Sequence, residues 1–270
     1  MNQDERRRYL IDALQEERAA QGADPVSIPP DTPSQRSLLR ALMNVRPPLA
    51  AAPEMLSTQD AYLAGRLRER GGEVDAATLP TVDARDPVRS RIALWRGDIT
   101  LLAADAIVNA ANGQLLGCFV PGHRCIDNAI HTFAGMQLRL ACAELMREQG
   151  REEPPGGVKV TPAFNLPSTL VFHTVGPIVR DGAPTACDRA LLASCYRSCL
   201  EEATTRRLGT LAFCCISTGL FGFPQREAAR IAIEAVTDHL NRRDSTLKVI
   251  FDVFLDTDER IYQELLCGAR

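Results

Sequence analysis

The stretch DAIVNAANGQLLGCFVPGHRCIDNAIH, residues 105–131, decides the fold of this chain. Residues 106–108 are a short apolar run, which predicts a buried strand. The glycines and proline that follow predict an irregular loop, and Asp127 is placed to cap a helix that begins there. In this order of strand, loop and helix, the free N–H groups of the first helical turn can bind an anionic ligand.

Two thiols and one imidazole lie close together in this loop, as Cys118, His123 and Cys125. Cysteine and histidine are typical zinc ligands. Three protein ligands leave the fourth tetrahedral position open, which is typical of a catalytic zinc rather than a structural one. A structural site would need a fourth donor, and the nearest candidates, His131 and Cys142, could equally face the core. The alternative interpretation makes both cysteines small core residues and His123 a solvated loop residue.

Composition and charge exclude several classes of protein. The 270 residues are 45% hydrophobic with a net charge of −3, and no block of like charge indicates binding to nucleic acid or to a membrane surface. No apolar run is long enough to span a bilayer, and residues 1–10 lack the apolar core of a signal peptide. The 9 cysteines do not form the pattern of a small disulfide scaffold. We therefore expect a cytoplasmic protein whose thiols are free to bind metal.

Residues 1–90 are predicted to form a helical N-terminal extension. Apolar residues recur at helical spacing in residues 3–20, and Ser34 is predicted to cap a second helix. A third helix is predicted within residues 57–72, with capping-box residues at its start and a glycine pair at its end. No motif of catalytic chemistry occurs in this region, which favours packing or partner contact as its role.

Residues 91–270 are predicted to form an α/β domain. Apolar strand segments alternate there with helical patterns. The segments are IALW, DAIVNAA, VKVTPA, LVFHTV, TLAFCCI and LKVIFDVF. The loop STGLFGFP, residues 217–224, follows one of these strands and precedes a helix expected from about Gln225. Strands in such sheets present their carboxyl ends to ligands, so this loop should face residues 112–125 across one cleft.

The other cysteines have a simpler interpretation. On a helix predicted from Asp188, Cys195 and Cys199 recur at helical spacing among apolar residues, which favours core positions. The same interpretation extends to Cys187, Cys214, Cys215 and Cys267.

Several segments, taken together and in order, resemble the macrodomain, an ADP-ribose-binding module. They are RGDIT at 96–100, DAIVNAAN at 105–112, DNAIHTFAG at 127–135 and STGLFGFP at 217–224. The insertion GCFVPGHRC at 117–125 resembles the zinc-dependent macrodomains, a subgroup of protein ADP-ribose hydrolases often paired with a class M sirtuin. The extension before it also resembles that subgroup. The resemblance implies a macrodomain-type mixed sheet sandwiched between helices, preceded by an N-terminal helical extension.

The resemblance also implies which residues bind the ligand. Asp98 is expected to accept a hydrogen bond from the adenine amino group, with the Ile99 backbone alongside, whereas the alternative is a turn aspartate. Asn112 is expected to bind the distal ribose, and the alternative interpretation, a loop asparagine at positive φ, is compatible with that role. The ribose end further includes Cys125, Ile126 and Asp127. The loop expected to wrap the diphosphate comprises Ser217, Thr218, Gly219, Leu220, Phe221 and Gly222, with Phe221 packed on the distal ribose. His131 is interpreted as structural.

The predicted reaction is hydrolysis of the bond that joins the distal ribose of ADP-ribose to a protein side chain. Zn²⁺ held by Cys118, His123 and Cys125 would polarise an oxygen of the substrate or lower the pKa of a bound water towards ~7. Asp127 is expected to orient or deprotonate a water, or to hold a ribose hydroxyl, and together with Asn112 completes the predicted catalytic set.

Two other functions compete with this one. A reader would bind ADP-ribose without turnover, and a zinc-stabilised scaffold would use the extension as its working surface. The open metal position favours the hydrolase over the reader, and the ordered ligand motifs argue against the scaffold. The expected partners are ADP-ribose and an ADP-ribosylated protein, for which the resemblance suggests a lipoyl-carrier protein, together with a class M sirtuin.

Overall fold

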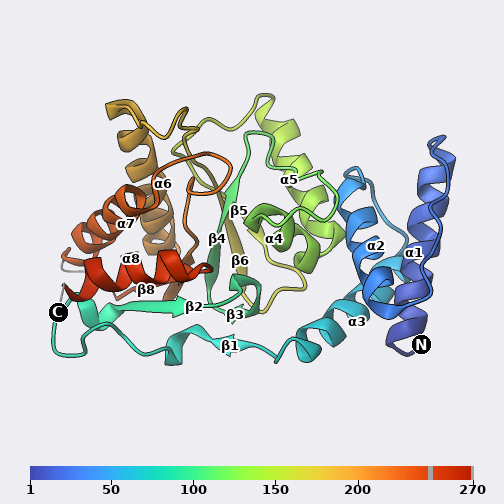
Figure 1. Cartoon of the computed structure of the whole chain (residues 1–270), viewed down its shortest axis with the longest axis horizontal. Coiled ribbons are helices and arrows are strands. Elements are labelled where there is room, and N and C mark those ends of the chain that lie inside the picture. The colour runs from blue at the N-terminus through green and yellow to red at the C-terminus, as the bar shows by residue number, and fades with distance from the viewer. Residues whose placement is uncertain (243–245, 269–270) are drawn as a thin grey trace.

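The computed structural model describes residues 1–242 and 246–268. Three helices form the N-terminal extension: α1 (Gln3–Ala20), α2 (Thr32–Val45) and α3 (Pro53–Glu69). They pack around an apolar cluster that includes Leu10, Leu39 and Leu63 and is completed by Met136 of the domain that follows. Figure 1 shows the three helices beside α4 (Ile126–Ala134) and α5 (Met136–Gln149) at one end of the molecule. The helical part of the extension therefore ends at Glu69. The boundary between two domains at residue 90 stays a prediction.

Helix α1 has the predicted bounds, whereas the starts of α2 and α3 differ from the sequence-based expectation. Asp31 caps α2, because its side chain accepts a hydrogen bond from the backbone N–H of Ser34 at 2.8 Å, so the predicted Ser34 cap is wrong. Helix α3 begins at Pro53, before the predicted capping box, and has no side-chain cap. Proline suits that position because it lacks the N–H that a first turn leaves unpaired. The predicted glycine closure is correct, since the N–H of Gly72 donates to the carbonyl of Leu67 at 3.0 Å.

A six-stranded mixed sheet forms the centre of the molecule, in the order β2-β8-β7-β4-β6-β5. Its strands are β2 (Ile92–Arg96), β4 (Ala106–Ala111), β5 (Lys159–Pro162), β6 (Leu170–Val175), β7 (Thr210–Phe213) and β8 (Lys248–Val253). All neighbouring pairs are parallel except β5 with β6. Each strand lies within or next to a segment predicted for it, although β7 ends before Cys214.

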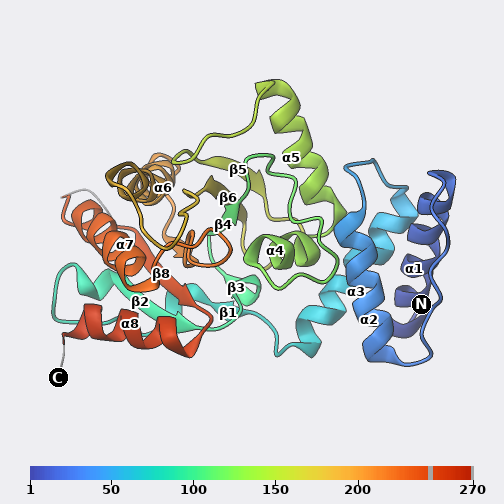
Figure 2. The ribbon, with the colours of Figure 1, turned by 45° about the horizontal axis from the view of Figure 1, so that its top comes forward.

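Helices cover the sheet on both sides. They are α4 (Ile126–Ala134), α5 (Met136–Gln149), α6 (Ala186–Thr205), α7 (Gln225–Leu240) and α8 (Asp256–Cys267). Figures 1 and 2 show α4 and α5 on the side of the N-terminal helices, and α6, α7 and α8 on the opposite side. Burial on both faces explains why the strands are apolar runs rather than alternating patterns, and Ile107, Phe172 and Phe251 are almost fully buried. The predicted macrodomain-type fold is confirmed.

The shorter elements lie between α3 and β4, before and after β2. Strand β1 (Val74–Asp75) pairs in parallel with β3 (Leu102–Ala103). Single 3-10 turns lie at η1 (Ala76–Thr78), η2 (Arg89–Arg91) and η3 (Ile99–Leu101). Among the described residues, no helix is both long and apolar enough to cross a bilayer.

Two of the cysteine predictions are wrong. Cys195, Cys199 and Cys214 are buried as predicted and Cys215 is partly buried, but Cys187 and Cys267 are exposed. Cys187 is the second residue of α6 and Cys267 is the last of α8. These two cysteines lie at helix ends and face solvent. Helical periodicity alone does not show where a helix end extends beyond the layer on which the helix packs.

Candidate functional site

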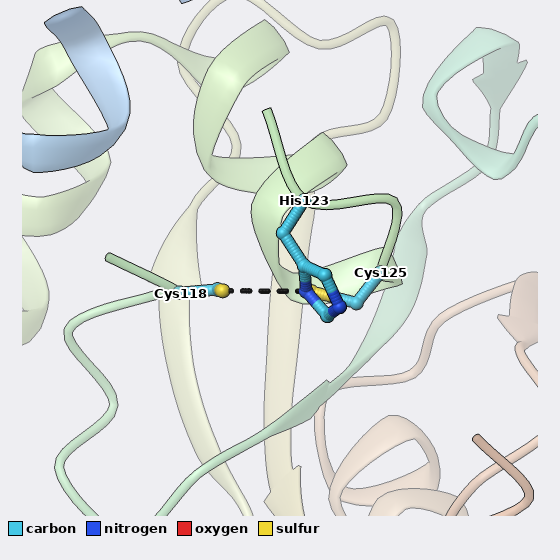
Figure 3. Close-up of side chains that lie close together, drawn as sticks. All are labelled: Cys118, His123 and Cys125. Atoms are coloured by element: carbon cyan, nitrogen blue, oxygen red, sulfur yellow. Dashed lines mark hydrogen bonds between the residues drawn. The ribbon is translucent and has the colours of Figure 1, made fainter. Parts of the chain in front are cut away.

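The loop between β4 and α4 brings Cys118, His123 and Cys125 together. The Sγ of Cys118 lies 3.5 Å from Nδ1 of His123, and the ligand atoms of all three residues lie within 4.8 Å of one another. Figure 3 shows the Cys118 thiol pointing at the imidazole, with the Cys125 side chain directly beside it. These distances show that the three predicted side chains cluster. All three are partly buried and therefore remain accessible from solvent.

The geometry of this cluster fits a zinc ion. Tetrahedral zinc with ordinary Zn–S and Zn–N bonds holds a sulfur and a nitrogen ligand about 3.5 Å apart. The Cys118–His123 separation of 3.5 Å matches that value. Burial raises the pKa of the Cys125 thiol to about 12, and the nearby Cys118 and Asp127 contribute to the rise. A cation between these groups would remove the electrostatic cost of the thiolates.

The two candidates for a fourth ligand belong to another group of side chains. His131 and Cys142 cluster with His173 in the buried interior. The Nε2 of His173 lies 2.9 Å from the hydroxyl of Thr161 and 3.8 Å from the thiol of Cys142. Burial lowers the pKa of His173 to about 4, so this imidazole is neutral at physiological pH. We interpret the group as a neutral polar network, which leaves three ligands at the loop.

Asp127 has a different position from the one predicted. The side chain that caps α4 is that of Cys125, which accepts from the N–H of Asn128 at 3.4 Å, so the predicted Asp127 cap is wrong. Because α4 begins at Ile126, Asp127 lies inside the first turn, where the residue is 5% exposed. Burial raises the pKa of its carboxyl group to about 6, although a hydrogen bond from Asn109 opposes the rise.

The carboxylate of Asp127 is held by two asparagines of the DAIVNAAN segment. Nδ2 of Asn109 donates to Oδ1 at 2.8 Å, and Nδ2 of Asn112 lies 3.5 Å from Oδ2. Nε2 of His131 is 3.6 Å from Oδ1. Sequence reasoning missed Asn109, which is fully buried within the apolar strand β4. An asparagine in a strand buried on both faces is the signal that could have identified it, because such an amide needs partners.

Asn112 organises the loop that follows β4. Its Nδ2 donates to the carbonyl of Gly117 at 3.1 Å, and its Oδ1 accepts from the N–H of Gln114 at 3.0 Å. It does not adopt positive φ, so that alternative interpretation is wrong. Gly117 does, at φ 81°, and a Cβ there would lie 2.8 Å from the ring of His131. Only glycine allows the backbone to pass this imidazole.

Asp98, at the predicted adenine end, caps the short η3 turn. Its Oδ1 accepts from the N–H of Thr100 at 3.0 Å, and its Oδ2 accepts from Nη2 of Arg70. The side chain remains 36% exposed, which leaves it accessible to a ligand. Arg70 follows α3 and lies 3.7 Å over the ring of Phe133, a contact that sequence reasoning missed. The Ile99 side chain is buried, so only its backbone can face a ligand.

The loop of residues 217–222 follows β7, which is the parallel neighbour of β4 in the sheet. The two loops therefore leave the same edge, as predicted. Ser217 and Gly222 adopt positive φ, and a Cβ on Gly222 would lie 2.8 Å from the carbonyl of Val179. The N–H of Val179 donates to the carbonyl of Phe221 at 2.7 Å, which anchors the loop. Thr218 and Phe221 are partly buried, whereas Gly219 and Leu220 are exposed and open to a ligand.

Comparisons with known proteins agree with this fold. A family model described as Macro domain matches residues 108–232. A protein-ADP-ribose hydrolase of Treponema medium is 49% identical over 266 residues, which cover 98% of this chain and 100% of that protein. One of Staphylococcus aureus (strain MRSA252) is 45% identical over 259 residues, covering 95% and 93%. A Trypanosoma brucei macrodomain, solved in complex with ADP-ribose, superposes with a TM-score of 0.65 at 30% identity, covering 84% and 94%.

These findings identify the family of the chain and its relatives within that family. The chain belongs to the macrodomain family. Within that family, it is similar along nearly its whole length to the protein-ADP-ribose hydrolases, so the prediction of an enzyme is confirmed.

Proposed function

We propose that this macrodomain is a zinc-dependent hydrolase that removes mono-ADP-ribose from modified proteins. The observation that carries the proposal is the convergence of Cys118, His123 and Cys125 in the loop that runs from Asn112 to Asp127 in the first turn of α4. A reader has no need of a metal with an open position, whereas a hydrolase uses one. The names of the full-length relatives support hydrolysis of protein-linked ADP-ribose.

Different residues contact different parts of ADP-ribose. Asp98 and the Ile99 backbone receive the adenine, and the backbone of residues 217–222 wraps the diphosphate. Asn112 binds the distal ribose. Asp127 orients the attacking water or a ribose hydroxyl, and the bond from Asn109 fixes its carboxylate. Zinc at the loop would supply Lewis acidity or a bound water of lowered pKa.

The proposal extends to partners and place of action. The modified protein is a lipoyl-carrier protein, and a class M sirtuin is the associated partner, as the zinc-dependent subgroup suggests. The net charge of −3 does not favour binding to nucleic acid. A cytoplasmic location stays a prediction.

The deciding experiment measures release of ADP-ribose from a mono-ADP-ribosylated protein. Wild-type protein should release it, a chelator should stop the release, and zinc added back should restore it. Release that continues at the same rate under chelation would contradict the zinc dependence.

Purified protein should contain about one zinc ion per chain, since three N/S donors converge in the loop. Metal analysis of Cys118→Ala and Cys125→Ala should show the zinc lost while circular dichroism shows the fold kept. Cys187→Ala is a matched control, because that thiol is exposed and outside the cluster. Full zinc retention in either loop variant would eliminate the proposed site.

Asp98→Ala should weaken ADP-ribose binding by roughly 1–3 kcal/mol, because the adenine amino group loses its acceptor. Titration calorimetry measures the change. Glu264→Ala is a control that removes a carboxylate from an exposed ion pair with Arg226. Unchanged affinity in Asp98→Ala would mean that another group binds the adenine.

A further inference from the structure

The loop with the three ligands is also held from outside, by helix α2 of the extension. Arg40 and Asn44 lie one helical turn apart and so project from the same face of α2. Arg40 contacts Asn128, 88 residues further along the chain, and Asn44 contacts Gly122, 78 residues further along. The predicted role of the extension in packing therefore includes contacts with the candidate metal site.

Arg40 acts on the loop mainly through Asn128. Its Nε and Nη2 both donate to Oδ1 of Asn128, at 3.1 and 2.7 Å, and Nη2 also donates to the carbonyl of His123 at 3.3 Å. The amide of Asn128 donates in turn to the carbonyls of Cys118 and Val120, at 3.4 and 3.2 Å. Asn128 is fully buried. Arg40 thus fixes the orientation of an amide that holds the loop backbone at Cys118 and Val120.

Asn44 holds the same loop at a second point. Its Oδ1 accepts from the N–H of Gly122 at 3.0 Å, and its Nδ2 donates to the hydroxyl of Thr132 at 3.0 Å. The Asn44 side chain is almost fully buried between the loop and α4. Gly122 immediately precedes His123 and adopts φ 66°. The hydrogen bond to Asn44 therefore holds the backbone that presents this imidazole against α2.

We propose that Arg40 and Asn44 are positioning residues through which the N-terminal extension sets the zinc affinity of the loop. This inference rests on the proposed function, because it requires the loop to bind zinc. A loop rich in glycine and proline loses conformational entropy when three donors are brought together. Contacts that hold it in the binding conformation beforehand reduce that loss and increase affinity. Neither residue supplies a donor to the metal.

Zinc affinity of the full-length variants tests the inference, measured by competition with a chromophoric chelator. Arg40→Ala and Asn44→Ala should raise the zinc Kd by about 10–100-fold, the usual effect of removing groups that orient metal ligands. Arg36→Ala is the matched control, since it lies one turn earlier on α2 and pairs with Glu69 at 2.7 Å. Its zinc Kd should equal that of wild type.

Two further measurements separate positioning from loss of the fold. Saturating zinc should restore turnover in Arg40→Ala, because its three donors are intact. Arg40→Lys should melt like wild type yet bind zinc several-fold more weakly, since a single ammonium cannot reproduce the forked contacts of a guanidinium. Wild-type zinc Kd in both Arg40→Lys and Asn44→Ala would overturn the inference. A wild-type chain that binds no zinc would instead contradict the proposed function.

Discussion

His123→Ala is expected to stop ADP-ribose release from a modified protein while leaving ADP-ribose affinity close to that of wild type. The metal's contribution is realised mainly in the transition state, whereas the adenine and diphosphate contacts are made equally in the ground state. A loss of about 4 kcal/mol of transition-state stabilisation corresponds to a rate reduction of ~10³-fold. Single-turnover release, measured beside a binding titration, reports both quantities.

Chelator-treated wild type provides the comparison for this variant. It should release ADP-ribose as slowly as His123→Ala does, and added zinc should restore wild type but not the variant. Wild-type release by His123→Ala would make the zinc structural and the proposed mechanism wrong. If wild type binds ADP-ribose yet releases none from any modified protein tried, the reader function takes the place of the hydrolase.

Asp127→Ala is expected to show the same asymmetry to a lesser degree, with release slowed on the order of 10²-fold or more if this carboxylate handles a proton. The structure places the carboxylate 3.5 Å from Nδ2 of Asn112, within reach of the predicted ribose site. Zinc content should stay at the wild-type level, because Asp127 is not one of the three ligands. The same single-turnover assay measures the rate.

Asp127→Asn distinguishes the two roles of this side chain. The amide keeps an oxygen that can accept from Asn109, but it cannot take up a proton. Release as slow as that of Asp127→Ala would support proton transfer, and release near the wild-type rate would indicate that Asp127 only holds water or ribose in place. Wild-type rates in both variants would exclude Asp127 from the reaction.

Much of the fold could be predicted because its signals are local. The strand segments are apolar runs that a sheet covered on both faces requires, and β6 and β8 lie inside the predicted segments. Helix starts were less predictable, since several polar residues compete for each cap and small differences in backbone geometry decide among them. Asp31 rather than Ser34 caps α2 for this reason, and Cys125 rather than Asp127 caps α4.

The metal-binding donors could be found from sequence because Cys118, His123 and Cys125 lie within one short loop, where chain connectivity alone keeps them near each other. The sequence by itself thus determined the family, the strands of the six-stranded sheet and the candidate ligands. Only the tertiary structure decided which distant side chains hold them. Arg40 reaches Asn128 across 88 residues, and nothing in local periodicity distinguishes it from Arg36, one turn away on the same helix. Packing of α2 against α4 makes Arg40 part of the site, whereas Arg36 pairs with Glu69 of α3.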